Sequence, residues 1–377
     1  MANDPILVVV FLRGGADGLN LISPTADTDY IAARPESLRV LRNSDDAGLL
    51  MPDMAADVDF RFHPQARGLS ELYNAGELAV IHASGLTDGT RSHFDAEVKM
   101  ERAAVSGSAG GWLGRWFASQ QTEGILPLLA VGAAPESLRG ARNVAVTRDL
   151  EDLILAGGHF FAPRLRNHIA QGFSQHPLIS APVERLIQLS TTLQSKILDE
   201  NGDAKTYTPS AAYPENELTD PFKTIARATK LDLGLRVATL DFGGWDTHHD
   251  QAGDFATNVD ALSSSLLAFW RDLGPEAERV NVVVMSEFGR RLRSNNSGGT
   301  DHGYGNAMMV LGAGVKGGHM LGKWPGLAND ALDDRADLAI TTDYRHVLAE
   351  IMARHMMAQN NAALFPAFTP DPVGLFG

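Results

Sequence analysis

Carboxylate and imidazole side chains cluster next to four short apolar segments of this sequence. They are Asp17 in RGGADGLN, Asp246, His248 and His249 in GGWDTHHDQ, Glu287 directly after NVVVMS, and Asp301 and His302 in GTDHGYGN. Oxygen and nitrogen ligands without sulfur suit zinc, manganese, magnesium or calcium. A single aspartate in a glycine-rich loop is more often a turn residue. Turns do not call for three histidines, however, so the four segments together predict a divalent metal site.

The segment TDGTRSHFDAEVKMERA could supply a nucleophile. Ser92 stands where a helix should begin, with Arg91 before it and His93 after it. Free N–H groups at a helix N-terminus favour an anion, which suits an activated serine hydroxyl. His93 is a possible metal ligand or proton donor. Ser92 and Asp95 also fit a capping box, a purely structural role that does not exclude catalysis.

Arginines close to these residues could hold the oxygens of an anionic substrate. A guanidinium matches phosphate or sulfate oxygens with two parallel hydrogen bonds. Most surface arginines are only solvated, so the prediction is restricted to Arg290, which follows Glu287 closely, and Arg91. Asp301 is a further candidate proton donor.

The elements that position these residues follow from the apolar pattern. Short runs rich in Val, Ile and Leu predict buried strands at residues 6–12, 78–83, 126–131, 143–147, 235–242, 281–286 and 307–312. Apolar residues spaced three and four apart predict helices at about 63–74, 92–104, 183–198, 221–230, 253–273 and 342–357. Alternation of the two types predicts an α/β fold with a mostly parallel sheet and helices on both faces. Ligands then bind beyond the carboxyl ends of the strands, where the candidate residues lie.

Composition limits the remaining possibilities. The 377 residues predict a single α/β domain, in which residues 133–214, with weaker strand signals, form an insertion or cap. A formal net charge of -14 without a basic stripe argues against nucleic-acid binding. The sequence has no cysteine, which excludes thiolate ligands. No run is long and apolar enough for a membrane span, and the first residues are interpreted as a strand and not as a signal peptide.

The ordered motifs resemble a family of bacterial proteins in the alkaline phosphatase and sulfatase superfamily. They are RGGADGLN, RSHFDAE, GGWDTHHDQ, VVVMSEFGR and GTDHGYGNAMMVLGAGVKGG, and the resemblance runs from about residue 5 to residue 358. It implies a doubly wound α/β sheet, like that of alkaline phosphatase, whose strand ends hold one or two divalent metals beside a nucleophile. The implied roles are a first-strand ligand at Asp17, a nucleophile at Ser92, a ligand pair of Asp246 with His248 or His249, a late-strand ligand at Glu287 and a last ligand at His302. Phe288 stands where the superfamily often has a further histidine ligand.

The function implied by this resemblance is metal-dependent hydrolysis of phosphate or sulfate esters, with Ser92 or a metal-bound water as the nucleophile. The substrate would be a small anionic ester or a sulfated or phosphorylated glycan. The resemblance also implies export to the periplasm or beyond. Two alternatives stay open: a phosphoryl transferase or mutase on the same scaffold, and a non-catalytic protein that binds an anion, glycan or partner through a decayed site.

Overall fold

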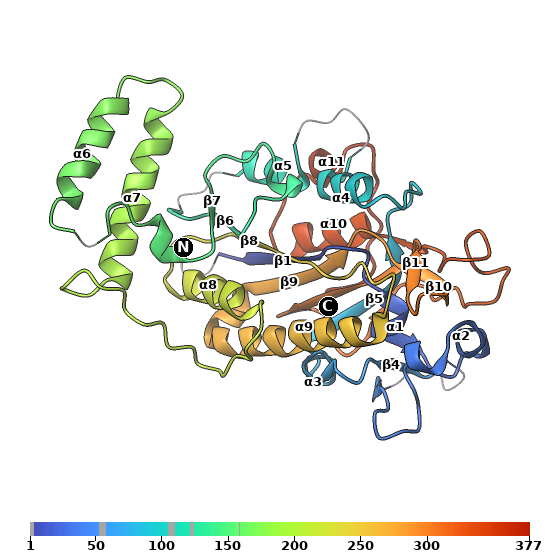
Figure 1. Ribbon diagram of the computed structural model, residues 1–377. Coiled ribbons are helices and arrows are strands. Elements are labelled where there is room, and N and C mark those ends of the chain that lie inside the picture. Colours follow the sequence, from blue (N-terminus) through green and yellow to red (C-terminus); the bar gives the residue numbers. More distant parts are fainter. Residues whose placement is uncertain (1–3, 53–57, 105–109, 121–123, 158) are drawn as a thin grey trace.

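The computed structural model describes residues 4–377 apart from 53–57, 105–109, 121–123 and 158 (Figure 1). Within this part of the chain the centre is a nine-stranded sheet. Its strands are β1 (Ile6–Leu12), β5 (Leu78–Gly85), β6 (Leu128–Val131), β7 (Val144–Thr147), β8 (Val237–Phe242), β9 (Val280–Ser286), β12 (Asn306–Gly312), β13 (Met320–Leu321) and β14 (Thr342–Asp343). They lie in the order β13, β5, β12, β9, β1, β8, β6, β7, and β14 also pairs with β5.

The strands run parallel except for β12, which is antiparallel to both of its neighbours, β5 and β9. The central strand β1 pairs in parallel with β8 on one side and with β9 on the other. The carboxyl ends of β1, β8 and β9 therefore meet at one edge of the sheet, and the beginning of β12 lies at the same edge. The loops that follow or precede these ends carry the candidate site residues.

Helices cover both faces of the sheet (Figure 1). One face is covered by α3 (Arg67–Asn74), α8 (Thr219–Lys230) and α9 (Gln251–Leu273), and the other by α4 (His93–Arg102), α5 (Trp112–Ala118), α10 (Tyr344–Arg354) and α11 (Asn361–Leu364). Side chains of β1 alternate between two apolar cores, with Val8 and Val10 in one and Leu7 and Val9 in the other. This explains why β1 has an unbroken apolar sequence. The predicted α/β class with a mostly parallel sheet is confirmed.

All seven predicted strands are present, with ends shifted by two residues or fewer. Sequence patterns missed the short elements α1 (Gly18–Leu21), α2 (Thr28–Ala33), β2 (Ile22–Pro24), β3 (Leu49–Leu50), β4 (Phe60–Phe62), β10 (Arg290–Ser294) and β11 (Thr300–His302). The 3-10 turns are η1 (Glu36–Leu38), η2 (Glu136–Leu138), η3 (Leu150–Leu153) and η4 (Gly274–Arg279). β10 pairs with β11 in a small hairpin between β9 and β12. This hairpin brings the end of β9 and the start of β12 to the same place.

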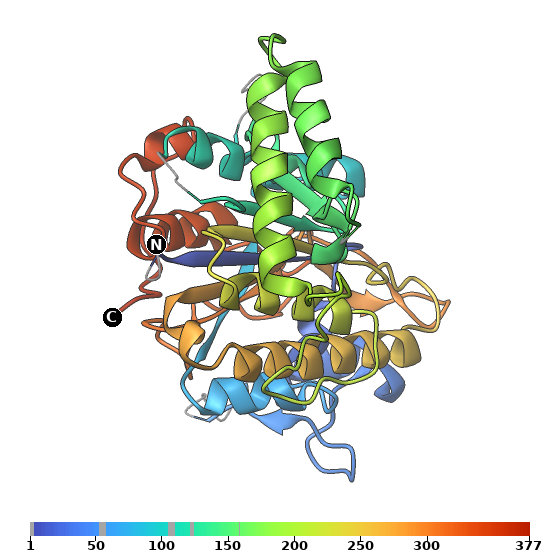
Figure 2. The same ribbon diagram turned by 90° about the vertical axis from the view of Figure 1, so that its left-hand side faces the viewer.

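Helices α6 (Ala162–Phe173) and α7 (Ser180–Ile197) form a hairpin that extends away from the sheet (Figures 1 and 2). It lies within residues 133–214, which also include β7, a strand of the main sheet. The division of the chain into one domain with an insertion or cap there stays a prediction. In the described residues, none of the helices combines the length and the apolar character that crossing a membrane requires.

Candidate metal centre

The loops after β1 and β8 pack against each other at the carboxyl edge of the sheet. Gly14 has a φ of 120°, and a Cβ atom there would lie 2.4 Å from the backbone nitrogen of Asp246. Only glycine allows this approach without strain. The glycines of the RGGADGLN motif are thus required by the packing of the loop that follows β1.

The side chain of Arg290 lies between these two loops and forms hydrogen bonds with both. Its side chain is buried, and its guanidinium donates hydrogen bonds to five acceptors. They are the carbonyl oxygens of Gly14, Gly15 (2.6 Å), Trp245 (3.0 Å) and Thr300 (2.8 Å), and Oδ1 of Asp246 (2.7 Å). The predicted role in holding a substrate anion does not fit this placement, because nearly all donors of the guanidinium are already used. Arg290 instead fixes Asp246.

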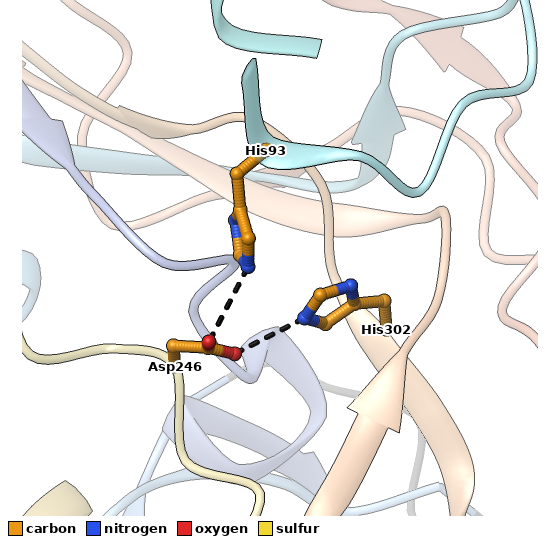
Figure 3. A group of neighbouring side chains, drawn as sticks. All are labelled: His93, Asp246 and His302. Carbon is orange, nitrogen blue, oxygen red and sulfur yellow. Dashed lines mark hydrogen bonds and ion pairs between the residues drawn. The ribbon is translucent and has the colours of Figure 1, made fainter. Parts of the chain in front are cut away.

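Asp246, His93 and His302 form the centre of the cluster, and all three point toward one another (Figure 3). One ligand atom from each lies within 4.8 Å of the others. His302 Nε2 lies 3.1 Å from Asp246 Oδ1, and His93 Nε2 lies 3.5 Å from Asp246 Oδ2. The three residues come from the start of α4, the loop after β8 and the end of β11, so the fold assembles the group from distant parts of the chain.

His248 adds a third imidazole. Its Nε2 lies 2.9 Å from His302 Nε2 and 3.1 Å from Asp246 Oδ1. The other ring nitrogens face groups that only accept: Asp301 Oδ1 lies 3.3 Å from His248 Nδ1, and the Arg91 carbonyl lies 2.9 Å from His302 Nδ1. Each Nδ1 can therefore carry the proton, which leaves the corresponding Nε2 free to bind a metal. Without a metal, the two Nε2 atoms and Asp246 Oδ1 are close enough to share a proton.

Glu287 determines the orientation of His93. Its Oε1 lies 2.7 Å from His93 Nδ1 and accepts from the Gly14 backbone N–H at 2.8 Å. The hydroxyl of Ser286 donates to its Oε2 at 3.0 Å. His93 Nε2 consequently faces Asp246, buried and without a hydrogen-bond partner. Glu287, predicted as a direct ligand, instead binds the opposite nitrogen of a histidine, the usual arrangement of carboxylate, imidazole and metal.

The electrostatics of the cluster favour a cation. Partial burial opposes ionisation of Asp246, but its contacts with His302 and Arg290 outweigh this and hold its pKa at about 2. Burial likewise opposes ionisation of Glu287, and hydrogen bonds from His93 and backbone N–H groups lower its pKa overall. Burial lowers the pKa of His302. The hydrogen bond to Glu287, by contrast, raises the pKa of His93. The group thus combines ionised carboxylates with imidazoles that a metal can bind once it displaces any proton on the Nε2 atoms.

Asp17 and His249 lie outside the cluster. Asp17 is fully buried, and both of its oxygens bind the guanidinium of Arg34 at 2.8 and 3.0 Å. Gln251 donates a further hydrogen bond to Asp17 at 2.7 Å. A second ion at Asp17 and Glu287 does not fit, because partners already occupy both carboxylates. His249 is exposed, so His248 and not His249 accompanies Asp246.

Ser92 and Arg91 lie on the segment that leads to His93. Ser92 is exposed at the N-cap position of α4, and its side chain makes no capping hydrogen bond, so the predicted capping box does not form. The Arg91 guanidinium binds the buried carboxylate of Asp337 and lies 4.1 Å from the centre of the Tyr304 ring. Its side chain therefore anchors the segment, while its carbonyl holds His302. The role of Ser92 as nucleophile stays a prediction.

Two residues that sequence patterns missed support the cluster. Phe288 is buried, and its ring centre lies 4.9 Å from that of His93 and 4.8 Å from that of His302, which makes an apolar wall. Asn295 donates to the His248 carbonyl at 2.9 Å and to Asp301 at 3.1 Å. Its own oxygen accepts two backbone N–H groups of the turn. The Asn-rich turn in RSNNSGG is a signal that could have identified it.

Comparison with known proteins gave one family and several solved structures. A family model described as Protein of unknown function (DUF1501) matches residues 79–366. Ps i-CgsB in complex with k-i-k-neocarrahexaose matches with 12% identity and a TM-score of 0.39, over 95% of this chain and 73% of that one. The C-terminal periplasmic domain of EcEptC from Escherichia coli, in complex with Zn, matches with 6% identity and a TM-score of 0.38, over 82% and 74%. Alkaline phosphatase from the Antarctic bacterium TAB5 matches with 11% identity and a TM-score of 0.33, over 82% and 92%. No curated protein sequence matched.

Proposed function

The chain belongs to the family described as Protein of unknown function (DUF1501), and we propose that it is a metal-dependent hydrolase of phosphate or sulfate esters. The observation that carries this proposal is the convergence of three imidazole Nε2 atoms, from His93, His248 and His302, on the carboxylate of Asp246. Each imidazole has its other nitrogen bound to an acceptor. Partners of this kind are typical of metal-binding histidines.

The ligand set favours one ion of zinc or a similar transition metal. Three nitrogens and one carboxylate oxygen suit Zn²⁺ or Mn²⁺ better than Mg²⁺ or Ca²⁺, which prefer oxygen ligands. An ion bound there would act as a Lewis acid that stabilises negative charge on an ester oxygen. We propose a single ion because Asp17 and Glu287 are occupied by Arg34 and His93.

Other residues near the proposed ion would supply the nucleophile and shield the imidazoles from water. Ser92 is exposed directly before His93, so its hydroxyl is the candidate nucleophile, with water as the alternative. Asp301 is less suited to donate a proton than was predicted, because hydrogen bonds from Asn295 and His248 lower its pKa. It instead orients His248. Phe288 would keep water away from one side of the imidazoles.

Metal analysis and an ester panel test the proposal together. The purified protein should contain about one equivalent of metal and should hydrolyse at least one of p-nitrophenyl phosphate, bis-p-nitrophenyl phosphate and p-nitrophenyl sulfate. The variant His302→Ala should lose both metal and turnover, whereas Ser92→Ala should keep the metal and lose turnover. His249→Ala is the matched control and should keep both. Metal without any turnover would refute hydrolysis, and full turnover in Ser92→Ala would exclude Ser92 as the nucleophile.

One observation favours a second candidate, a non-catalytic protein that binds an anion or a glycan through the metal. The guanidinium groups of Arg290 and Arg91 are both engaged, so neither is free to hold the non-reacting oxygens of an ester. A protein that holds metal and binds a sulfated glycan by calorimetry, but hydrolyses none of the panel, would have this function. Phosphoryl transfer would appear as product formation only when an acceptor alcohol is present.

The proposed substrate is a small anionic ester or a sulfated or phosphorylated glycan, and the proposed location is the periplasm or another exported compartment. Both rest on the motif resemblance described above. Fractionation of cells that express the full natural gene would test the location.

A further inference from the structure

The main sheet ends at strand β7, whose outer edge pairs with no strand in the described part of the chain. On its inner side β7 pairs in parallel with β6, from Val144 opposite Leu128 to Thr147 opposite Val131. An unpaired edge presents a row of backbone N–H and C=O groups to any extended segment that reaches it. Natural sheets usually protect such edges with charged side chains, with proline or with a covering element.

A groove of about 880 Å³ runs along this edge, between β7 and helix α7. One wall contains the consecutive residues 142–146, and Ile125 and Leu126, which precede β6, and Leu153 of η3 also line the groove. Successive side chains of a strand point to opposite faces, so a groove that contacts each residue from 144 to 146 reaches the outer edge of β7. The other wall is one face of α7 and its N-terminal approach. Its residues are Pro177, Leu178, Ala181, Pro182, Arg185, Leu186 and Leu189, spaced three or four apart for the most part.

The walls of this groove expose apolar side chains. Leu178 is 80% exposed, Val146 47% and Leu186 39%. Most of the large apolar side chains that are exposed in the described residues lie between positions 146 and 186. They are Val146, Phe160, Phe161, Leu165, Phe173, Leu178, Ile179 and Leu186. Three of them, Val146, Leu178 and Leu186, line the groove, and exposed apolar side chains that share a groove are typical of an interaction site.

The charge of the groove identifies the kind of partner. Arg142 and Arg185 line it, and none of its lining residues is acidic. The whole chain, by contrast, has a net charge of -14. In a symmetric pair of two copies joined at their β7 edges, each arginine would meet the same positive groove of the other copy. A foreign segment with carboxylates would complement the groove instead.

We propose that this groove binds an extended segment of a partner protein, which adds to the sheet beside β7 and carries acidic side chains. β7 has four residues, so the added strand pairs over about 13 Å. Main-chain hydrogen bonds to β7 hold the segment, alternate apolar side chains contact Val146, Leu178 and Leu186, and carboxylates bind Arg142 and Arg185. This surface is separate from the metal cluster, so the proposal does not depend on the proposed hydrolysis.

A peptide array tests this binding mode. The full chain, fluorescently labelled, is incubated with a positional-scanning library of seven-residue peptides built on alternating Val and Thr. We expect the bound peptides to alternate apolar residues and to contain Asp or Glu. In the variant Arg185→Glu the preference should shift to Lys, with at least a tenfold loss of affinity for the best acidic peptide. Arg164→Glu is the matched control, since Arg164 is exposed on α6 outside the groove, and it should bind like the wild type.

Hydrogen exchange with the best acidic peptide distinguishes strand addition from other binding. Amides of residues 144–147 should exchange more slowly in the complex. Three results would overturn the proposal: no acidic preference in the array, an unchanged preference in Arg185→Glu, or binding without added protection in β7. Sedimentation equilibrium provides a fourth, because a dimer that Arg185→Glu dissociates would show that a second copy covers the groove.

Discussion

Replacing Glu287 by glutamine should remove the negative charge of this side chain while keeping its shape. The variant therefore tests what the charge alone contributes to metal binding. In the variant Glu287→Gln the amide oxygen can still accept from the Gly14 N–H and from His93 Nδ1–H, as Oε1 does now at 2.8 and 2.7 Å. The new amide N–H can donate to Ser286 Oγ, because that hydroxyl can donate to the Leu12 carbonyl, 2.7 Å away. These three hydrogen bonds thus have counterparts, and the main loss is the negative charge behind His93.

That charge makes His93 a better electron donor to a metal at Nε2. Loss of a carboxylate partner behind a metal-binding histidine typically lowers metal affinity by about tenfold to a hundredfold. This corresponds to about 1.4 to 2.7 kcal/mol of binding free energy. Glu287 is fully buried, so solvent does not screen its charge and the full effect should be seen.

The dissociation constant for Zn²⁺ should be measured by competition with a chromophoric chelator at pH 8, where protons compete little for the imidazoles. Glu350→Gln is the matched control. Glu350 is also buried and also accepts backbone N–H groups, those of Val373 and Gly374, but it lies outside the cluster. An affinity of Glu287→Gln within twofold of both the wild type and this control would refute the assigned role of Glu287.

Three further predictions concern stability. Burial lowers the pKa of His82 to about 4, below the value of about 6.5 in an unfolded chain. Its contribution to stability, about 3 kcal/mol, should therefore be complete above pH 6.5 and disappear as the pH falls through 4, and His82→Gln should flatten this dependence in urea titrations. Asp17→Asn leaves the charge of Arg34 buried without its partner and should cost about 3–5 kcal/mol in urea unfolding, with metal content unchanged. Arg290→Lys leaves several buried carbonyls unpaired at about 1–3 kcal/mol each, and should lower both the urea midpoint and the Zn²⁺ affinity.

Each of these predictions has a control or a contrary result. His319→Gln removes an exposed histidine and should keep the pH dependence of the wild type. A lost metal in Asp17→Asn would mean that Asp17 affects the cluster after all. Unchanged Zn²⁺ affinity in Arg290→Lys would show that the contact with Asp246 does not position that ligand.

The sheet could be predicted because its strands are buried on both faces. A strand such as β1 then has an unbroken apolar sequence, which even a single sequence reveals. Ligands bind at the carboxyl ends of strands, and for this reason Asp246, His248 and His302 could be predicted to belong to one metal site. The short strands β10 and β11 were missed because they are partly exposed and rich in charged residues, and their pairing depends on the neighbouring strands β9 and β12.

The roles of individual charged residues could not be predicted, because a sequence does not show which partner each residue meets. Asp17 follows a strand just as Asp246 does, but Arg34, directly after α2, binds it. Arg290 has the type and position of an anion ligand, yet it is buried among carbonyl groups. Glu287 stands at a strand end, but His93 begins a helix 194 residues earlier and comes between Glu287 and the cluster.

The network around Arg290 also bears on how quickly the protein could take up the proposed ion. The same guanidinium binds the loop after β1, the loop after β8 and β11, so these segments are held together whether or not anything is bound. The entropy of ordering Asp246 is then lost when the chain folds and not when the ion arrives. Binding of an ion to such a preorganised site would need no slow ordering of the loops. The arrangement of all three segments would then depend on the single side chain of Arg290.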